Sequence, residues 1–189
     1  MNIISVYPGR FNFPHRGHIE SFMGMYHSMP GKSMLAMTDS NEYMTFDERR
    51  FVLMSLGVPQ DRIIKVSSPY NIKEYETYIS NKSDTLCFFF LGEKDRDRFS
   101  HKIKKDVTYL QHASTMDDVM VIPKACDKHS YLVYKKTVTH KGYKSSTEWI
   151  KAYKDSDDRY NFLCNVYGNI PNLNKIYEIY EERFYYDWH

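Results

Sequence analysis

The sequence predicts an α/β protein whose core is a doubly wound, parallel sheet of five strands. Short β-rich runs alternate with segments of helical periodicity over residues 1–122, which is typical of parallel strands covered by helices on both faces. The run Thr85–Leu91 (TLCFFFL) is apolar, as expected of a strand that is buried on both faces. From about Ser146 the pattern is helical, which predicts a C-terminal helical extension.

Each expected element follows from local composition and spacing. The strands are expected at Asn2–Tyr7, Ser33–Met37, Arg62–Val66, Thr85–Leu91 and Asp118–Ile122. The helices between them are expected from His18 to near Pro30, from Thr45 to Leu56, from Ile72 to Ile79 and from Asp95 to Lys105. Thr45 and Glu48 have the spacing of a capping box, which marks the start of the second helix.

The C-terminal part of the chain lies outside this alternation. Ile176, Tyr180 and Phe184 recur every four residues, as on one face of a helix. The segment Lys124–Lys144 has no clean period, and we expect it to be a loop or a hairpin. We therefore expect one α/β domain over residues 1–145, with a helical extension over residues 146–189 packed on the same domain.

The composition is that of an ordinary globular protein. Of the 189 residues, 42% are hydrophobic and 26% are charged, and the formal net charge is only +2. Lys102–Lys105 is a short basic stretch, for which a solvated helix face is the simpler interpretation. Because nucleic-acid binding needs a clustered basic surface, we expect no nucleic-acid partner.

Cysteine usage and hydropathy indicate an intracellular protein. Cys87, Cys126 and Cys164 stand far apart without a CxxC pair, so they form neither a disulfide framework nor a zinc ribbon. The N-terminal residues lack a basic segment followed by an apolar stretch of signal length. The longest apolar run, Leu86–Leu91, is too short to cross a bilayer. We expect a cytoplasmic protein without a membrane partner.

The segment Gly9–His18 (GRFNFPHRGH) follows the first strand and leads directly into a helix. A glycine-containing turn at a helix N-terminus presents unpaired backbone N–H groups and the positive end of the helix dipole, which favour phosphate. His15 and His18 lie three residues apart and can donate to phosphate oxygens, while Arg10 and Arg16 add charge. The segment therefore predicts a phosphate site.

This segment resembles the HxGH motif of the nucleotidylyltransferase superfamily. Its wider string is similar to the GRFxPxHxGH form found in nicotinamide mononucleotide adenylyltransferases of the archaeal and related bacterial type, except that Pro14 stands one place later than usual. The resemblance covers about residues 1–155 and implies a Rossmann-like fold. It assigns catalysis to His15, His18 and Arg10 and nucleotide binding to Gly9, Phe11 and Gly17. A turn with a metal-binding or core histidine pair is the alternative.

Two shorter segments resemble the same family. Thr45–Arg49 (TFDER) resembles a T-x-x-E-R segment, which implies that Arg49 lies near the phosphates; an ordinary exposed helix arginine is the alternative. Where the apolar strand ends, the family has a glycine and an acidic residue, which implies that Gly92 and Asp95 line the nucleotide pocket. Glu93 could take the acidic position instead, and either carboxylate could be a helix N-cap charge.

A last segment, Lys144–Lys151 (KSSTEWIK), resembles the second superfamily signature, I-S-x-T-x-[IV]-R. The resemblance implies that the outer phosphates are bound, together with helix-start amides, by Ser145, Ser146 and Thr147. The arginine position is occupied by Ile150, so the charge is either supplied by Lys151 or lost. A capping motif for the next helix is the alternative, because Ser and Thr caps use the same orphan amides.

Together these resemblances imply an adenylyltransferase that uses ATP with Mg²⁺. A phosphate oxygen of the acceptor would attack the α-phosphorus of ATP, and pyrophosphate would leave. Mg²⁺ would be held mainly by the phosphates of the nucleotide, and no metal ligand is assigned to the protein. Asn12 stands where cytidylyltransferases and pantetheine-phosphate adenylyltransferases usually have aspartate, which favours nicotinamide mononucleotide as the phosphorylated acceptor. Tyr70 and Asn71 would line the acceptor pocket, although Tyr70 could equally be a packing residue.

Other functions stay open at this point. Cytidylyl or pantetheine-phosphate adenylyl transfer would use the same loop. A nucleotide-binding sensor without turnover would fit the isoleucine at position 150. A fragment of a class I aminoacyl-tRNA synthetase shares the loop motif, but the chain is short for an anticodon-binding region and carries little positive charge. A homo-oligomer is compatible with all of them.

Overall fold

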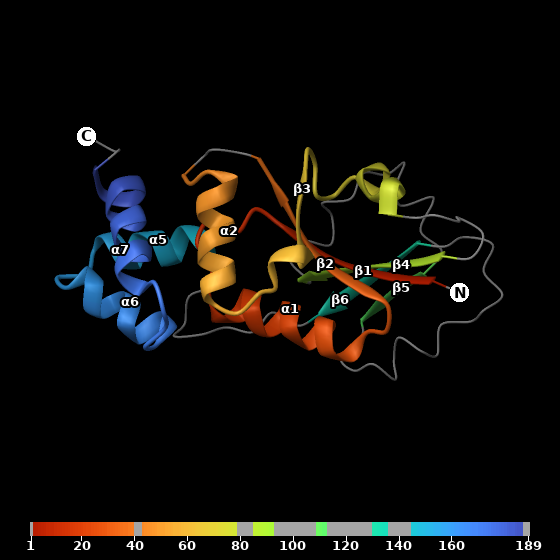
Figure 1. The fold of residues 1–189 in the computed structure, drawn as a ribbon, viewed down its shortest axis with the longest axis horizontal. Coiled ribbons are helices and arrows are strands. Elements are labelled where there is room, and N and C mark those ends of the chain that lie inside the picture. The colour runs from red at the N-terminus through yellow and green to blue at the C-terminus, as the bar shows by residue number, and fades with distance from the viewer. Residues whose placement is uncertain are drawn as a thin grey trace. The chain divides into compact units, whose positions relative to one another are not determined.

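The computed structural model describes residues 2–39, 43–78, 85–92, 109–112, 130–135 and 145–186. The chain divides into two compact units (Figure 1). The sheet unit consists of Met1–Gly9, Phe22–Thr38 and Ile64–Thr137, and the helical unit consists of Arg10–Ser21, Asp39–Ile63 and Val138–His189. The expected division of the chain after residue 145 stays a prediction.

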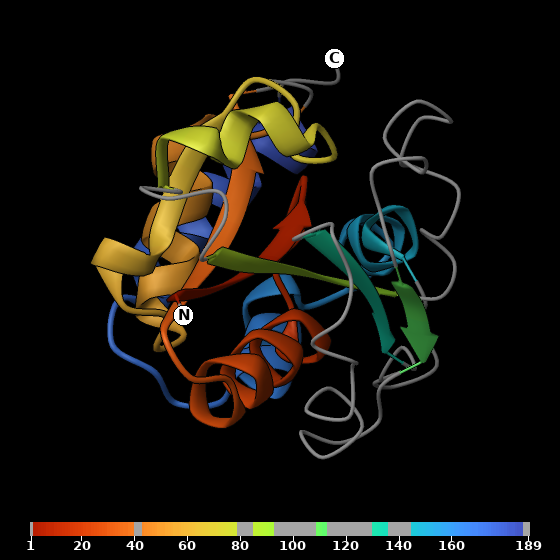
Figure 2. The same cartoon turned by 90° about the vertical axis from the view of Figure 1, so that its right-hand side faces the viewer.

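Within the described residues, the sheet has six strands in the order β3-β2-β1-β4-β6-β5 (Figure 2). Their bounds are β1 Asn2–Gly9, β2 Lys32–Thr38, β3 Ile63–Val66, β4 Thr85–Gly92, β5 Tyr109–His112 and β6 Ser130–Lys135. The pairs β1–β2, β1–β4, β4–β6 and β5–β6 are parallel. The prediction of a parallel α/β sheet is therefore confirmed.

The predicted number of five strands is wrong. The first four expected strands correspond to β1 to β4, with ends that differ by at most two residues. β6 lies inside the segment that we expected to be a loop or hairpin, and β5 has only four residues. The segment that contains β6 has no clean hydrophobic period, so the sequence predicts no parallel strand there. The fifth expected strand, Asp118–Ile122, lies outside the described residues.

The order of the strands reverses at β1. β2 and β3 follow one another on one side of β1, and β4 lies on its other side, so successive strands are added to the sheet first in one direction and then in the opposite one. β1 pairs with β4 only from Asn2 to Val6, while its pairing with β2 continues to Gly9. Pro8 therefore lies beyond the part of β1 that is paired on both sides, where a missing N–H is tolerated. In open α/β sheets the ligand binds beyond the carboxyl ends of the strands at such a switch point.

Each face of the sheet carries apolar side chains. One face forms a core with Tyr75 from the 3₁₀ helix η2 (Ile72–Tyr78); the sheet residues in this core are Ile4, Val6, Met34, Ala36, Ile64, Val66, Cys87, Phe89 and Leu91. The Tyr75 ring meets the Phe89 ring edge-on at 5.3 Å, and its hydroxyl donates to the Pro69 carbonyl at 2.6 Å. The expected helix at 72–79 is thus present, but it has the tighter 3₁₀ form.

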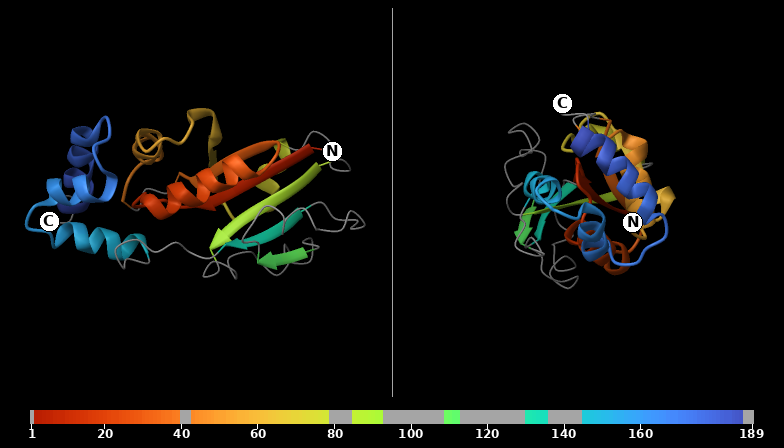
Figure 3. Two further views of the ribbon diagram at one scale, coloured as in Figure 1. Left: turned by 90° about the horizontal axis from the view of Figure 1, so that it is seen from below. Right: turned by 90° about the vertical axis from the view of Figure 1, so that its left-hand side faces the viewer.

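The opposite face is covered by the later part of α1 (Arg16–Ser28), from Phe22 onward (Figure 3). Phe22, Met25 and Met29 are buried there. The helix ends before Gly31, which has a φ of 79°. A Cβ at Gly31 would lie 2.2 Å from the carbonyl oxygen of Ile3, so this turn requires glycine on steric as well as conformational grounds.

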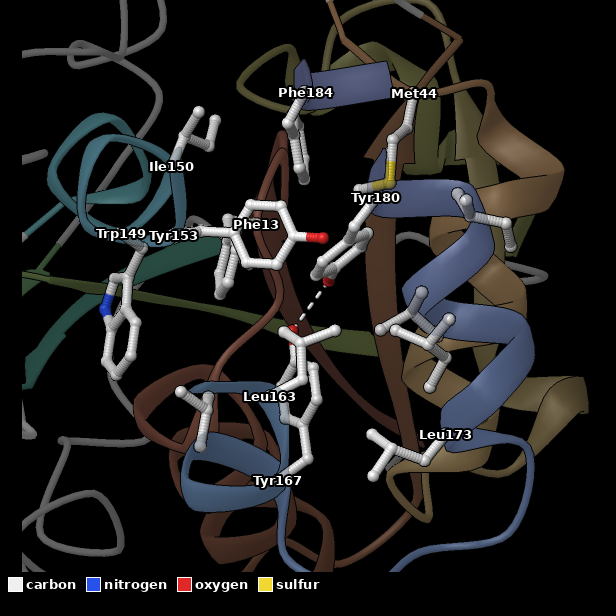
Figure 4. Packing of buried hydrophobic residues seen from close by; sticks show 14 residues of the cluster. Phe13, Met44, Trp149, Ile150, Tyr153, Leu163, Tyr167, Leu173, Tyr180 and Phe184 are labelled. Carbon is white, nitrogen blue, oxygen red and sulfur yellow. Dashed lines mark hydrogen bonds between the residues drawn. The ribbon is translucent and has the colours of Figure 1, made fainter. Parts of the chain in front are cut away.

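The helical unit is held together by aromatic packing (Figure 4). Its helices are α2 Phe46–Ser55, α5 Ser146–Lys154, α6 Arg159–Tyr167 and α7 Leu173–Tyr180, followed by the π-helical turn η5 Glu181–Tyr186. Phe13 is fully buried at the centre of the cluster, with the rings of Trp149, Tyr153, Tyr167, Tyr180 and Phe184 within 6.5 Å of its own. The predicted helical tail is confirmed, including the burial of Ile176, Tyr180 and Phe184.

Two capping boxes set the starts of α2 and α5. The Thr45 hydroxyl accepts from the Glu48 amide at 3.2 Å, and the Glu48 carboxylate accepts from the Thr45 amide at 2.9 Å. Ser145 and Glu148 make the same reciprocal pair at the start of α5. The predicted capping box at Thr45 is therefore confirmed. No helix within the described residues is both long and apolar enough to cross a membrane.

Candidate functional site

The loop that carries the predicted phosphate site follows β1 and ends where α1 begins. Its side chains belong to the helical unit, and most of them are buried: Phe11, Asn12, Phe13, Pro14 and His15. Phe11 has a φ of 53°, in the left-handed region that costs a non-glycine residue roughly 1 kcal/mol. A strained residue of this kind persists only where its surroundings hold it, and such positions cluster at functional loops.

His15 is the N-cap of α1. Its carbonyl accepts from the amides of His18 at 3.0 Å and Ile19 at 3.2 Å, which closes the first turn of the helix. Its side-chain Nδ1 accepts from the Gly17 amide at 3.1 Å. The N-cap of this helix is therefore an imidazole, whereas most helices are capped by a serine hydroxyl or an aspartate carboxylate. Unlike a carboxylate, the imidazole brings no negative charge to the helix N-terminus.

The hydrogen bonds of the two histidines fix which ring nitrogen carries the proton. Nδ1 of His15 accepts from Gly17, and Nδ1 of His18 accepts from the His15 amide at 3.4 Å. A neutral imidazole has one donor and one acceptor nitrogen, so the proton of each ring is on Nε2. Both rings are therefore N–H donors at Nε2, which is the form needed to bind phosphate oxygens.

The two imidazole rings lie against each other. Their centroids are 3.7 Å apart with an interplanar angle of 30°. His15 also stacks on Trp149 at 5.5 Å, and His18 meets the edge of the Phe11 ring at 5.0 Å. His15 is buried and His18 is half-buried. The histidines thus form one donor pair on one side of the α1 N-terminus, and the prediction that they project from the same turn is confirmed.

The other residues of the first motif lie on the same segment of the chain as this pair. Arg10 and Arg16 are exposed, and Arg16 is the first residue of α1. Gly17 is buried within the first turn, where its amide caps onto His15. Gly9 is the last residue of β1. The side chains on this short segment are those of an anion site: two imidazole donors and two guanidinium groups.

The Arg49 side chain binds the backbone of the loop. Its Nη1 donates to the Arg10 carbonyl, and its Nε donates to the Thr45 carbonyl at 3.2 Å. The side chain is completely buried, and this burial lowers the pKa of Arg49, while Asp39 and Glu48 act in the opposite direction. The alternative of an ordinary exposed helix arginine is wrong. Contact between Arg49 and a nucleotide phosphate stays a prediction.

The second motif lies at the start of α5. Ser145 is its N-cap, so the capping interpretation of this segment is confirmed, while Thr147 is exposed in the first turn. Trp149 lies against both Phe13 and His15, with ring planes within 19° of parallel. The structure therefore brings the two motifs together, although they are separated by about 130 residues. The phosphate contacts of Ser145, Ser146 and Thr147 stay predictions.

The position that the second motif gives to arginine faces the core. Ile150 is buried in the aromatic cluster of the helical unit. Lys151 is exposed and forms an ion pair with Asp155 one turn later. Since Lys151 points to solvent and already has a carboxylate partner, it offers no simple replacement for the arginine at the helix start.

The remaining predicted site residues belong to the sheet unit or lie outside the described residues. Gly92 ends β4, and Glu93 and Asp95 lie outside the described residues. Tyr70 is half-buried and packs against the sheet core around Tyr75, which fits its interpretation as a packing residue. The amide of Asn71 donates to the Ser68 carbonyl at 3.1 Å in a turn before η2. Their roles toward an acceptor stay predictions.

Two residues at this site were missed from the sequence. Tyr167 donates its hydroxyl proton to the Pro14 carbonyl, across 153 positions of the chain. The Trp149 ring stacks on the His15 ring. No local pattern could have indicated the first contact. The second had a signal, because Trp149 occupies the apolar position of the second motif.

The fold of this chain is shared with solved structures. The amino-acid sequence matches no protein-family model and has no significant match among curated protein sequences. In contrast, the Plasmodium falciparum nicotinic acid mononucleotide adenylyltransferase is similar in structure, with TM-scores of 0.57 in its complex with APC and 0.56 in its complex with NaAD. Identity is 14% in both cases, over 100% of this chain and 99% of that one.

A protein from Vibrio parahaemolyticus that is assigned as a nicotinate-nucleotide adenylyltransferase is also similar. Its TM-score is 0.51 at 13% identity, over 97% of this chain and 98% of that one. The chain has the fold of these adenylyltransferases. The likeness includes their Rossmann-like parallel sheet and extends over nearly the whole length of each partner.

Proposed function

We propose that this chain is a nucleotidylyltransferase that transfers AMP from ATP to a phosphorylated acceptor and releases pyrophosphate. The observation that carries the proposal is the pair of stacked histidines, His15 and His18, whose Nε2–H donors lie together at the N-terminus of α1. The loop before them follows the central strand of a sheet whose order reverses at that strand. The shared fold supports the same activity.

In the proposed reaction a phosphate oxygen of the acceptor attacks the α-phosphorus of ATP. The new bond joins that oxygen to the α-phosphorus, and the bond between the α-phosphorus and the α,β-bridging oxygen breaks, so its electrons leave with pyrophosphate. His15 and His18 donate to the oxygens on which this negative charge develops. The acceptor phosphate is already ionised at neutral pH, so no general base is required, and positioning and electrostatics supply the rate.

The acceptor is proposed to be a pyridine mononucleotide. Nicotinamide mononucleotide is the choice that the first loop favours, while the structural neighbours are named for nicotinic acid mononucleotide and nicotinate-nucleotide. The two acceptors differ only in a neutral amide against a carboxylate on the ring. Tyr70 and Asn71 are proposed to bind the acceptor, and Gly92 and Asp95 to bind the nucleotide. An intracellular location fits this role and stays part of the proposal.

Mg²⁺ is proposed to enter with the phosphates of ATP. Within the part of the chain that the structure describes, no three His, Cys, Asp or Glu side chains lie together as a metal cage. These residues therefore do not fit a resident protein-held metal, and no step of the proposed reaction passes through one. What the chain supplies is the pair of imidazole donors and the charges of Arg10 and Arg16.

A pyrophosphate-release panel tests the proposal directly. ATP and CTP are each paired with nicotinamide mononucleotide, nicotinic acid mononucleotide, pantetheine phosphate, glycerol phosphate and choline phosphate. We expect release with ATP and one of the two pyridine mononucleotides. Release only with CTP, or only with pantetheine phosphate, would reassign the substrate, and no release in any pair would exclude the transferase activity.

A second candidate is a nucleotide-binding sensor of the same fold that does not turn over. The observation that favours it is the burial of Ile150, where the second motif has arginine. Equilibrium binding of ATP separates the two candidates when it is measured beside pyrophosphate release. A sensor binds ATP and releases nothing, while the transferase does both.

A further inference from the structure

We propose that Arg49 and Tyr167 act as a loop clamp that holds the backbone of residues 10–15 in the orientation that presents the His15–His18 pair to the bound triphosphate. Both are positioning residues, since their hydrogen bonds hold carbonyl groups of the loop backbone. The inference rests on the proposed function, because the loop is taken to bind phosphate. It adds that the orientation of the loop amides is set from behind by two buried side chains on α2 and α6.

Arg49 fixes the first peptide group of the loop. Its guanidinium donates to the Arg10 carbonyl and, through Nε, to the Thr45 carbonyl at 3.2 Å. In a planar trans peptide group the carbonyl and the following N–H point in opposite directions. The Phe11 amide is therefore directed away from Arg49. Phe11, the next residue, has a positive φ of 53°.

Tyr167 fixes the last peptide group of the loop in the same way. Its hydroxyl donates to the Pro14 carbonyl and lies 2.6 Å from the Tyr180 hydroxyl (Figure 4). Because Tyr167 has one proton and gives it to Pro14, Tyr180 must be the donor of the second bond. The His15 amide is then directed away from Tyr167, and it donates to Nδ1 of His18 at 3.4 Å. The clamp thus reaches the histidine pair.

Burying a guanidinium and a tyrosine hydroxyl costs more free energy than filling the same space with apolar side chains. Arg49 has no solvent exposure, and Tyr167 has 4%. A buried guanidinium is costly unless its donors are satisfied, and apolar residues of similar volume usually fill such space at lower cost. A buried cation whose donors end on loop carbonyls holds the backbone and also adds positive potential behind an anion site. Both effects serve phosphate binding.

The test compares Tyr167→Phe with Tyr153→Phe. Each change removes one buried hydroxyl from the same aromatic cluster, but the Tyr153 hydroxyl donates to the Glu181 carboxylate at 2.6 Å instead of to the loop backbone. For each variant we measure the melting temperature, the Kd for MgATP, and amide hydrogen exchange at His15 without ligand. KM and kcat follow where turnover is present.

We expect both variants to melt earlier, and only Tyr167→Phe to bind ATP more weakly. The weakening should be about tenfold to a hundredfold, the range for losing one hydrogen bond to a charged group. The His15 amide should exchange faster in Tyr167→Phe than in Tyr153→Phe. Equal ATP affinity and equal exchange in the two variants would overturn the clamp, as would equal weakening by both.

Arg49→Lys is the second variant, with Arg183→Lys as its control. Lysine keeps the positive charge at position 49 but cannot donate from two fixed nitrogens to two carbonyls. Arg183, in η5, forms an ion pair at 3.0 Å with Glu48, which precedes Arg49 in α2. We expect weaker ATP binding for Arg49→Lys alone, and equal affinity in both would overturn its role. If the wild type bound no ATP, the proposed function would fail, whereas hydrogen exchange would still decide the clamp.

Discussion

Two helix starts in the helical unit meet the same physical problem in different ways. At α1 the cap is the His15 imidazole, and the neighbouring side chains are a second imidazole donor, His18, and the exposed Arg16. At α5 the cap is Ser145, and the Glu148 carboxylate accepts from the Ser145 amide at 3.2 Å. Both ends have satisfied amides, but only α1 keeps a positive environment. A carboxylate at the second start opposes phosphate there.

This difference indicates where the binding energy for a triphosphate should lie. In the superfamily the second motif brings an arginine to the end of its first helical turn, whereas here Ile150 faces the core and Lys151 pairs with Asp155. The α5 start is therefore a well-capped structural helix end beside the site. We expect α1 to carry most of the affinity and rate, and α5 to carry mainly stability.

The largest effect should come from His18→Ala. Removing one preorganised donor to a developing negative charge typically lowers kcat by about a hundredfold to a thousandfold. His18 is half-buried, so the fold should persist. The control is His27→Ala, an exposed histidine in the last turn of the same helix. Pyrophosphate release at saturating ATP measures both, and a near-native rate for His18→Ala would remove the role given to α1.

A second effect should appear when the missing arginine is restored as Ile150→Arg. Position 150 is 7% exposed and lies in the aromatic cluster, so a guanidinium there has no aqueous route. We expect a loss of roughly 3 kcal/mol in the free energy of unfolding and no gain in ATP affinity. Lys151→Arg, on the adjacent exposed position, should change neither quantity. Tighter ATP binding by Ile150→Arg would show that α5 is a phosphate site that lacks only its charge.

Local chemistry made much of this comparison predictable. The strands β1 to β4, the start of α2 and the phosphate character of Gly9–His18 all follow from composition over a few neighbouring residues. The burial of Ile150 also had a local signal, since Trp149, Ile150 and Tyr153 form an apolar stripe at helical spacing. Where sequence separation is short, the side chains that decide the structure can be read together.

The remainder depends on contacts between distant segments. Arg49 looks like a surface helix arginine in its own decapeptide, and only the Arg10 carbonyl, 39 positions away, explains its burial. Tyr167 belongs to an ordinary aromatic helix until Pro14 is placed beside its hydroxyl. Strand order has the same origin, because the insertion of β6 between β4 and β5 leaves no trace in a single-strand pattern.

The contribution of α5 to stability should depend on pH, because Tyr153 of this helix donates to the Glu181 carboxylate. Burial opposes ionisation of Glu181, but hydrogen bonds from Arg159 and Tyr153 outweigh it and lower the pKa of Glu181 below its ordinary value of 4.5. A carboxylate with a lowered folded pKa stabilises the fold above its unfolded pKa and loses that contribution as the pH falls through the folded pKa. Wild-type stability should therefore decline below about pH 4.5 more steeply than that of Glu181→Gln.

The control for that measurement is Glu178→Gln. Glu178 lies in α7, three residues before Glu181, and pairs with Lys175, but both side chains are more than 60% exposed. Exposed pairs contribute little, so its unfolding curves should follow the wild type at each pH. Denaturant unfolding between about pH 3 and pH 7 gives the comparison. A Glu181→Gln curve parallel to the wild type would mean that the Tyr153 anchor of α5 does not depend on the ionised carboxylate.

The smallest effects should separate capping from binding within α5 itself. Ser145→Ala removes the N-cap and should lower the free energy of unfolding by about 1 kcal/mol. Thr147→Ala, at an exposed position in the same turn, should leave stability unchanged and weaken ATP binding by a few-fold at most, since a phosphate there would still face Glu148. Unchanged ATP affinity in Thr147→Ala would leave this segment with capping as its whole role. A loss as large as that of His18→Ala would instead place the two helix starts on an equal footing and end the distinction between them.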